Sequence, residues 1–541
     1  MENKDIRRSH LLVYPGLIFS MVLLSIGLAF RLINLDNPFY WVDEVATSIR
    51  VSGYTQEQVV QQIATGDVLS TEDLQYYQQL NAERDWADTF DALRQSPEHA
   101  PLYFILARLW VQRFGRSVAA IRSLSLVCSL VALPCFYWLA VELFKSPPVG
   151  WMAVGLLSVS PFFVAYAQEA RPYSLWSVTL LLSGIALLRA MRLKTKASWG
   201  LYALTLAIAL YTSLLSAFVA LGQGICVVLM VNPISQLTGR RRHYVNATGL
   251  ALLAFSPWLL IIAQQWVTLQ TNTTWMREPM NVGAIAGILI YNLAVLFFDV
   301  PVSLDLSLAT FAKVAVSLVL LALMGYAVYL LRLKSPKSVW LFVVTFAGTL
   351  PVSLLLLDLV SNGQTSTAAR YLMPLQLGML LAIAHLLIHS MHSSSVTQAL
   401  IWRGVAIALI SLSIGSCLTH WHMPPKYQKS RNLSNRAIAA IVNQAESPLV
   451  IAEADQTLDM ISLSYMLNAS VRIALSSDIR SLLRLSACDS TFVFNPSSSV
   501  IQTIRANHQL DLDEIYQPKR LIAAERSLSL WTVTPTAENC L

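Results

Sequence analysis

Residues 12–44 read LVYPGLIFSMVLLSIGLAFRLINLDNPFYWVDE and contain the first apolar run of the chain. The run covers residues 12–33, which is close to the ~20 residues that a helix needs to cross a ~30 Å hydrocarbon core. The acidic pair Asp43-Glu44 follows ten residues after the run ends. Ionisable side chains at such a border are costly to desolvate, and are therefore functional candidates. The stretch predicts a membrane helix with a polar site close to its end.

The composition is that of a polytopic membrane protein. Hydrophobic residues make up 55% of the 541 residues and charged residues only 13%, and the mean hydropathy is +0.54; soluble domains have about 25% charged residues. The net charge of +7 does not indicate a nucleic-acid partner, because Lys and Arg gather at the ends of apolar runs. Lys4, Arg7 and Arg8 precede the first run, and no small-residue cleavage site follows it, so we expect a retained anchor.

Apolar runs and basic clusters predict the topology. Eleven spans are expected, near residues 12–33, 118–141, 149–165, 174–191, 198–213, 215–231, 246–264, 313–331, 338–358, 371–390 and 402–419. With a cytoplasmic N-terminus, the basic clusters around Arg192, Arg241 and Lys334 fall on the cytoplasmic side, as the positive-inside rule requires. Residues 101–114 are predicted to be an interfacial helix, and residues 284–300 a re-entrant or surface helix.

The chain divides by character into two predicted domains. Residues 1–419 form a transmembrane domain, whose first outer loop, with juxtamembrane helices, covers 34–117; within that loop, residues 34–100 hold 12 of the 31 acidic residues. Residues 420–541 alternate short β-like runs with helical patterns, which predicts a small extracytoplasmic α/β domain.

Four motifs in order on the predicted outer side carry a resemblance to a known family. They are Asp43-Glu44, His99-Ala100-Pro101-Leu102-Tyr103, Gln168-Glu169-Ala170-Arg171-Pro172-Tyr173 and Arg370-Tyr371-Leu372-Met373-Pro374. Together they resemble the GT-C membrane glycosyltransferases, and within them family 39 and its relatives, which include protein O-mannosyltransferases and aminoarabinose transferases. The resemblance covers residues 10–420. One departure is Ala100, where the family usually has a second proline after the histidine.

The resemblance implies transfer of one hexose or pentose from a polyprenyl-phosphate donor to a lipid, glycan or protein acceptor, outside a bacterial inner membrane. Asp43 is then the general base, a role typically worth about 10²–10⁴-fold in rate, and Glu44 orients the base or the acceptor. Arg171, Arg370, Tyr371 and His99 are expected to bind the donor phosphate, because a guanidinium can hold phosphate through two hydrogen bonds. Glu169 and His99 are candidate ligands of a divalent cation, Mg²⁺ or Mn²⁺.

Each candidate has a structural alternative. Asp43 and Glu44 can be solvated loop acids, and Glu98 with His99 can cap the following surface helix. Arg370 can extend its charged end to the interface. Tyr40 and Trp41 are predicted to be interfacial aromatic anchors, and Asp299 a polar loop residue. Cys488 and Cys540 fall in the outward tail, where an oxidising compartment would permit a disulfide.

Two other function classes share this composition. A polytopic lipid or sugar transporter, or a flippase, should show internal repeats and helices broken at matched positions, and the sequence shows neither. A non-catalytic binding or sensor protein is the other alternative, with the tail as its reporter.

Overall fold

The computed structural model describes residues 18–37, 39–230, 234–299, 307–422, 430–479, 482, 490–506, 510–518 and 528–535. Their contacts divide the chain into two units. The helical unit comprises residues 1–35, 96–103 and 122–423, and the loop–tail unit comprises residues 36–95, 104–121 and 424–541. Cys488 and Cys540, considered above as a possible disulfide pair, both lie outside the described residues.

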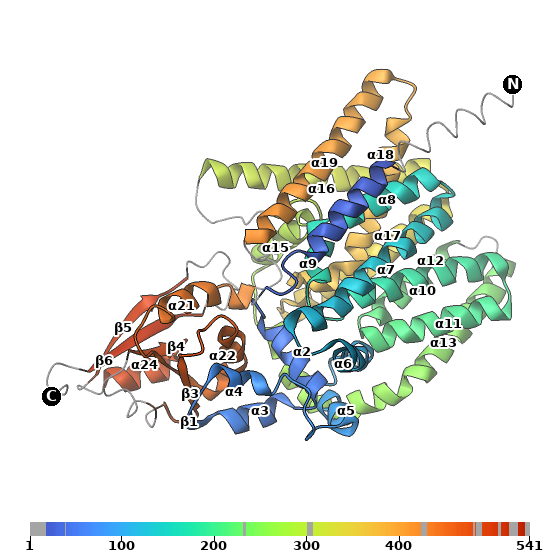
Figure 1. The fold of residues 1–541 in the computed structure, drawn as a ribbon. Helices are drawn as coiled ribbons and strands as arrows, with labels where there is room; N and C mark the ends of the chain where they lie inside the picture. Colours follow the sequence, from blue (N-terminus) through green and yellow to red (C-terminus); the bar gives the residue numbers. More distant parts are fainter. Residues whose placement is uncertain are drawn as a thin grey trace. The chain divides into compact units, whose positions relative to one another are not determined.

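Long apolar helices make up the helical unit (Figure 1). After helix Ile18–Leu32 they are α7 (Val118–Phe144), α8 (Pro147–Val159), α9 (Pro161–Ala167), α10 (Tyr173–Leu193), α11 (Lys196–Thr212), α12 (Ser216–Met230), α13 (Ile234–Gln264), α14 (Trp266–Asn272), α15 (Val282–Ala294), α16 (Leu308–Lys334), α17 (Lys337–Ser361), α18 (Met373–Met391) and α19 (Val396–His422). Short 3₁₀ turns η1 (Thr274–Arg277), η2 (Thr365–Thr367) and η3 (Ala369–Leu372) lie in the connections.

Each of the eleven predicted spans coincides with helix over its described residues, but their number as crossings is not confirmed. Seven described helices are long and apolar enough to cross a membrane, and the bent pair α8–α9, with 62° between its parts, would be an eighth. Ser160 ends α8 and Pro161 begins α9, which accounts for the break, because proline cannot continue the hydrogen bonding of the preceding helix. Helices 18–32, α11 and α12 are shorter.

Close backbone approaches fix the packing of these helices. Helix Ile18–Leu32 meets the end of α8 at Gly27, where a Cβ atom would lie 2.3 Å from the Ser158 carbonyl oxygen. The Arg31 guanidinium donates 2.9 Å hydrogen bonds to Gly27 O and Ser129 Oγ. Gly222 on α12 likewise would bring a Cβ to 2.5 Å from Thr345 O on α17. Small residues allow such contacts between membrane helices.

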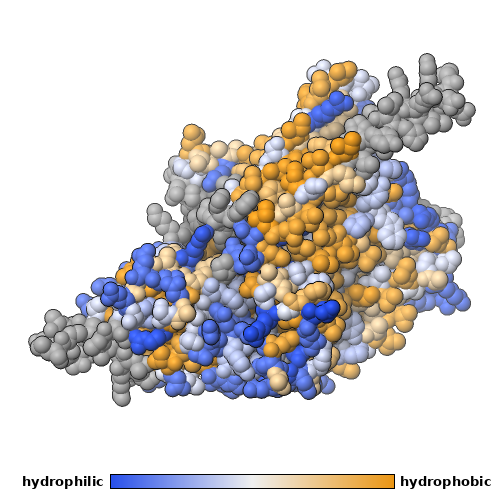
Figure 2. All heavy atoms as spheres, viewed as in Figure 1, coloured by the Kyte–Doolittle hydropathy of each residue, from blue (hydrophilic) through white to orange (hydrophobic). Residues whose placement is uncertain are grey.

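The surface of the helical unit is apolar where soluble proteins are polar. Figure 2 shows hydrophobic residues gathered over its long helices on one face. Large side chains exposed on α13, α16 and α17 include Leu253, Val319 and Val360. This surface fits hydrocarbon, and the chain is an integral membrane protein.

The loop–tail unit is an α/β structure built from three separate parts of the chain. Its elements are α2 (Val42–Ser52), α3 (Gln56–Ile63), β1 (Thr65–Leu69), α4 (Thr71–Tyr76), α5 (Trp86–Arg94), α6 (Leu102–Phe114), η4 (Ser430–Asn432), α21 (Asn435–Val442), β2 (Leu449–Glu453), η5 (Ala454–Gln456), α22 (Thr457–Ser464), β3 (Arg472–Ser476), β4 (Thr491–Phe494), α24 (Ser498–Arg505), β5 (Leu510–Tyr516) and β6 (Leu530–Pro535).

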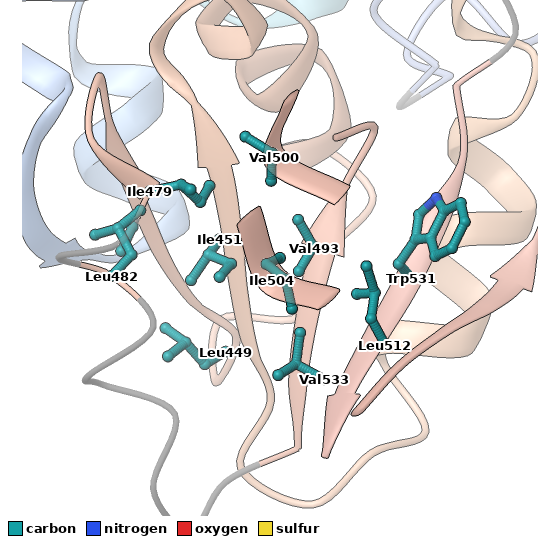
Figure 3. Close-up of a cluster of buried hydrophobic side chains, with 11 residues drawn as sticks. Leu449, Ile451, Ile479, Leu482, Val493, Val500, Ile504, Leu512, Trp531 and Val533 are labelled. Atoms are coloured by element: carbon teal, nitrogen blue, oxygen red, sulfur yellow. The ribbon is translucent and has the colours of Figure 1, made fainter. Parts of the chain in front are cut away.

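One six-stranded sheet joins the first loop to the tail. Its order is β1-β3-β2-β4-β6-β5, with β2 parallel to β3 and β4, and the other neighbours antiparallel. Residues Leu449, Val493 and Val533 of the central strands and Ile504 of α24 form part of its buried core (Figure 3). The α/β character predicted for the tail is confirmed, whereas the strand that the first loop contributes is absent from the sequence-based prediction.

Hydrogen bonds fix the short helices of the first loop. Ser70 begins α4 and exchanges side-chain and backbone hydrogen bonds with Asp73, and Asp85 begins α5 and does the same with Asp88. Hydrogen bonds from Ser70 hold the pKa of Asp73 below its ordinary value of 3.8. The predicted interfacial helix 101–114 is the helix α6. Its Arg108 is buried and donates to the Val51 carbonyl at 2.8 Å.

Candidate active site

The turn between α9 and α10 is fastened to the end of the first described helix. Gln168 Nε2 donates to Phe30 O at 2.8 Å and to Ile33 O at 2.5 Å. The last carbonyl groups of a helix have no partner within it, so this side chain satisfies two of them. The contact fixes the backbone of residues 168–172 at the end of helix Ile18–Leu32.

Two opposite charges are buried in this turn. Glu169 is 0% exposed and Arg171 4% exposed, and the Arg171 amide donates to Glu169 O at 2.7 Å. The Arg171 guanidinium lies 5.8 Å from the centre of the Tyr173 ring. Burying a charge is expensive unless other groups compensate it. The turn thus concentrates a buried carboxylate and a buried guanidinium at one helix end.

The histidine motif is connected to this turn through hydroxyl groups. Tyr103 and Ser125 share a hydroxyl–hydroxyl hydrogen bond of 2.8 Å, and Ser125 Oγ donates to the Arg171 carbonyl at 3.1 Å. The segment that carries His99 therefore meets the Arg171 turn at the start of α7.

On its other side, the histidine motif meets the last residue of helix α14, Asn272. His99 Nε2 lies 3.6 Å from Glu98 Oε1. Asn272 Nδ2 donates to the two Glu98 oxygens at 3.2 and 3.1 Å. The sequence analysis did not identify Asn272, although it lies in a polar stretch between two apolar segments.

Aromatic rings surround Arg370. Its guanidinium lies 5.3 Å from the Trp275 ring and 5.5 Å from the Tyr371 ring, within the distance at which cations are attracted to ring faces. Gln364 holds the two loops together, because its Nε2 donates to Trp275 O at 2.9 Å and its amide donates to Met276 O at 2.9 Å. Trp275 was also missed by the sequence analysis, which treated only the later loop as a motif.

These contacts bring three of the four predicted motifs together within the helical unit. The helices that follow the two arginines also touch near their beginnings, where Ser177 Oγ lies 3.7 Å from Met373 Sδ. The distance between the Arg171 and Arg370 guanidinium groups is not fixed by any of these contacts, so their shared phosphate site stays a prediction.

The fourth motif lies on the first turn of α2, in the loop–tail unit. Asp43 is half-buried and Glu44 is 0% exposed. Carboxylates are stabilised near a helix N-terminus by its free amide groups and dipole. The alternative that the pair is a set of solvated loop acids does not hold for Glu44. The placement of Asp43 opposite the arginines of the helical unit stays a prediction.

Residues of the tail hold the beginning of α2. Asn432 Oδ1 accepts from the Val42 amide at 2.9 Å, and Ser462 Oγ donates to Tyr40 O at 2.6 Å. Asn432 Nδ2 donates in turn to the buried Asp459 at 2.9 Å, and Arg431 donates three further hydrogen bonds of 3.0, 3.1 and 2.5 Å to that carboxylate. The tail therefore positions the acidic pair, and no local sequence signal reports this.

The prediction for the two aromatic residues before the acidic pair is wrong. Tyr40 and Trp41, expected to be interfacial anchors, are 1% and 5% exposed, because they pack against tail residues such as Tyr465 and Leu458.

Asp299 lies in a loop, as expected, but it is buried there. Its carboxylate accepts a hydrogen bond of 2.7 Å from Tyr291 Oη and another from His420.

The residues present suit one kind of metal binding. Among the described residues, no three His, Cys, Asp or Glu side chains are grouped as metal ligands. A magnesium ion shared with a substrate phosphate requires only one or two protein carboxylates. Glu169 meets this requirement.

Comparisons with known proteins agree with the motifs. Residues 98–261 match the family model described as dolichyl-phosphate-mannose-protein mannosyltransferase. This match confirms the predicted resemblance to GT-C glycosyltransferases over the segment that holds His99, Glu169 and Arg171. The comparison with curated proteins found no match.

Two solved structures resemble the chain at low identity. The crystal structure of ArnT from Cupriavidus metallidurans bound to undecaprenyl phosphate is 12% identical, with 96% of this chain and 98% of that chain covered and a TM-score of 0.47. The archaeal oligosaccharyltransferase AglB from Archaeoglobus fulgidus, in complex with an inhibitory peptide and a dolichol-phosphate, is 10% identical, with 84% and 64% covered and a TM-score of 0.46.

Proposed function

We propose that the chain is a membrane glycosyltransferase that transfers one sugar from a polyprenyl-phosphate donor to a lipid, glycan or protein acceptor on the extracytoplasmic side. The observation that carries the proposal is the buried charged turn with Glu169 and Arg171, within the segment that matches the mannosyltransferase family model. A buried guanidinium beside a membrane helix suits a phosphate whose hydrocarbon tail lies in lipid.

The proposed reaction is a displacement at the anomeric carbon. Asp43 accepts the proton of the acceptor hydroxyl, the acceptor oxygen bonds to the anomeric carbon, and the bond from that carbon to the phosphate oxygen breaks. The leaving polyprenyl phosphate is bound by Arg171, Arg370, Tyr371 and His99. Glu44 orients the base. A divalent cation, if held by Glu169 with or without His99, would supply further positive charge to the phosphate.

The activity is tested with the purified full-length protein and a panel of polyprenyl-phosphate sugars, by measuring release of polyprenyl phosphate. We expect Asp43→Asn to lower turnover at least a hundredfold while donor binding remains, because a positioned base contributes about 10²–10⁴-fold. Glu57→Gln is the matched control, since Glu57 is an exposed acid on α3 of the same unit. An Asn variant that keeps more than about a tenth of the turnover excludes Asp43 as the base, and donor binding without turnover by the unmodified protein favours the sensor alternative.

The proposed orientation has a separate test. Single cysteines replacing the exposed residues Gln62 and Lys334 should react with an impermeant reagent from the outer and the cytoplasmic side respectively, in a chain whose other cysteines are replaced. Reaction of both positions from one side would refute the arrangement with a cytoplasmic N-terminus and an outer tail.

A further inference from the structure

A cavity of about 330 Å³ lies inside the loop–tail unit. Its wall combines the first loop (Tyr40, Ser48 and Gln78), the first turn of α7 (residues 118–121, which belong to this unit), and Tyr465 of the tail. The volume is at the lower end of the range of about 300–1,000 Å³ that ligand pockets have in proteins. The cavity is therefore large enough for a small ligand.

The buried end of the cavity holds a polar group whose hydrogen bonding is incomplete. Gln78 is 7% exposed, and its Oε1 accepts a 3.0 Å hydrogen bond from Tyr465 Oη. Gln78 Nε2 is buried and has no hydrogen-bond partner among the described residues. Buried amides are nearly always hydrogen-bonded, so this donor points to an acceptor atom that a ligand would bring.

Two tyrosine rings form part of the wall beside Gln78. The rings of Tyr40 and Tyr465 lie 5.0 Å apart, and Tyr40 Oη shares a 2.5 Å hydrogen bond with Ser48 Oγ. Tyrosine combines an apolar face with a polar end. Tyr40 is buried and supports Tyr465, and the partly exposed Tyr465 ring can contact the C–H face of a sugar ring while hydroxyl groups of the sugar reach the surrounding amides.

The charges of the wall narrow the ligand class. Arg116 is the charged member of the described lining, and it is exposed at the rim; the remaining polar members are Tyr, Ser and Gln side chains. A cation would find no carboxylate in this described lining, and a hydrocarbon chain would leave the buried Gln78 Nε2 without an acceptor. An uncharged ligand with many hydroxyl groups satisfies both the donors and the acceptors.

We propose that this cavity binds the uncharged saccharide part of the acceptor. The inference rests on the proposed function, and it gives the tail a role, because Tyr465 and the bond to Gln78 exist only when the tail packs on the first loop. Tyr40 precedes Asp43 by three residues in the same unit, which links the cavity to the acidic pair along the chain.

Binding is measured on the full-length protein in lipid nanodiscs free of glycolipid, by saturation-transfer NMR. The probes are methyl glucoside, methyl mannoside, methyl galactoside, methyl arabinoside and N-acetylglucosamine. At least one probe should receive saturation, and Gln78→Leu should weaken its affinity about tenfold, since a lost hydrogen bond with a buried group left unsatisfied is worth on the order of 1.4 kcal/mol. Gln62→Leu, at an exposed glutamine of α3, should leave it unchanged.

Tyr465→Phe is a second variant in case Gln78→Leu does not fold. It keeps the aromatic ring and removes only the hydroxyl that donates to Gln78. It should weaken binding several-fold, and the protein should still unfold cooperatively, with a midpoint lowered only by the loss of one hydrogen bond to the buried Gln78. Failure of every probe to bind, or affinity that survives both the Gln78 and Tyr465 variants, overturns the assignment. Release of polyprenyl phosphate from donor alone tests the proposed function independently, so the two failures are distinguishable.

Discussion

Replacing Asn432 by alanine should slow turnover, although Asn432 is not one of the residues proposed to bind the donor or the acceptor. Asn432 is fully buried, accepts from the Val42 amide, and donates to Asp459. The substitution leaves the buried Val42 amide without an acceptor, which costs about 1–3 kcal/mol. Asp459 loses one donor and keeps Arg431. The first turn of α2 can lower this cost by moving until the Val42 amide finds another acceptor. Because Val42 directly precedes Asp43, such a movement would displace Asp43 as well.

Displacement of a catalytic group by about 1 Å can lower the rate about 10²-fold, so kcat should fall about tenfold to a hundredfold with little change in KM for the donor. The matched control is Asn443→Ala. Asn443 Nδ2 donates to Met466 O at 2.9 Å and Asn443 Oδ1 accepts from the Asn468 amide at 2.8 Å, so both partners are backbone groups of the tail and neither belongs to α2.

The assay combines donor turnover with thermal unfolding of both variants. Both should destabilise the loop–tail unit to a similar extent, but only Asn432→Ala should lower kcat. Equal losses of kcat in the two variants would attribute the effect to general destabilisation, and an unchanged kcat in Asn432→Ala would refute the view that the tail positions the acidic pair.

Three further predictions concern pH, packing and the donor phosphate. The lowered pKa of Asp73 means that its contribution to stability is complete above pH about 4 and is lost as the pH falls through its folded-state pKa; unfolding between pH 2 and 6 should show this dependence, and Ser70→Ala should reduce it. Gly27→Ala should destabilise the helical unit by about 1–3 kcal/mol through overpacking, whereas Gly404→Ala, with no atom near its Cβ position, should be tolerated in the same unfolding assay. Arg370→Lys should raise the KM for donor, because lysine cannot form the two parallel hydrogen bonds that a guanidinium makes with phosphate. Equal KM values for the lysine variant and the native protein would contradict the assignment of Arg370 to the donor phosphate.

The helices were predictable because their signal is local. An apolar run of about 20 residues has few folding alternatives in lipid, and every predicted span coincides with helix. The hydrogen bond from Val42 to Asn432 joins residues 390 positions apart, and no periodicity reports such a pairing. The same limit applies to Trp275, whose role beside Arg370 depends on two loops that meet only in the fold.

Buried aromatic residues were misinterpreted for a related reason. Tyr40 and Trp41 follow a membrane helix, and that position alone favours an interfacial role. Their burial results from tail side chains that sequence reasoning placed in a separate domain. Strand β1, TGDVL, contains Gly and Asp, which are depleted in strands. Its pairing with β3 therefore stabilises a strand that its own residues do not favour.

That pairing has a consequence for biosynthesis. Thr65 of β1 pairs with Ser476 of β3, so the partner strand is made 411 residues later. At about 5–20 residues per second, this delay is roughly 20 to 80 seconds. During it, the strand edge has no native partner and can join other chains. A ribosome that stops anywhere before β3, even after every membrane helix has been made, therefore leaves a first loop that cannot complete its sheet.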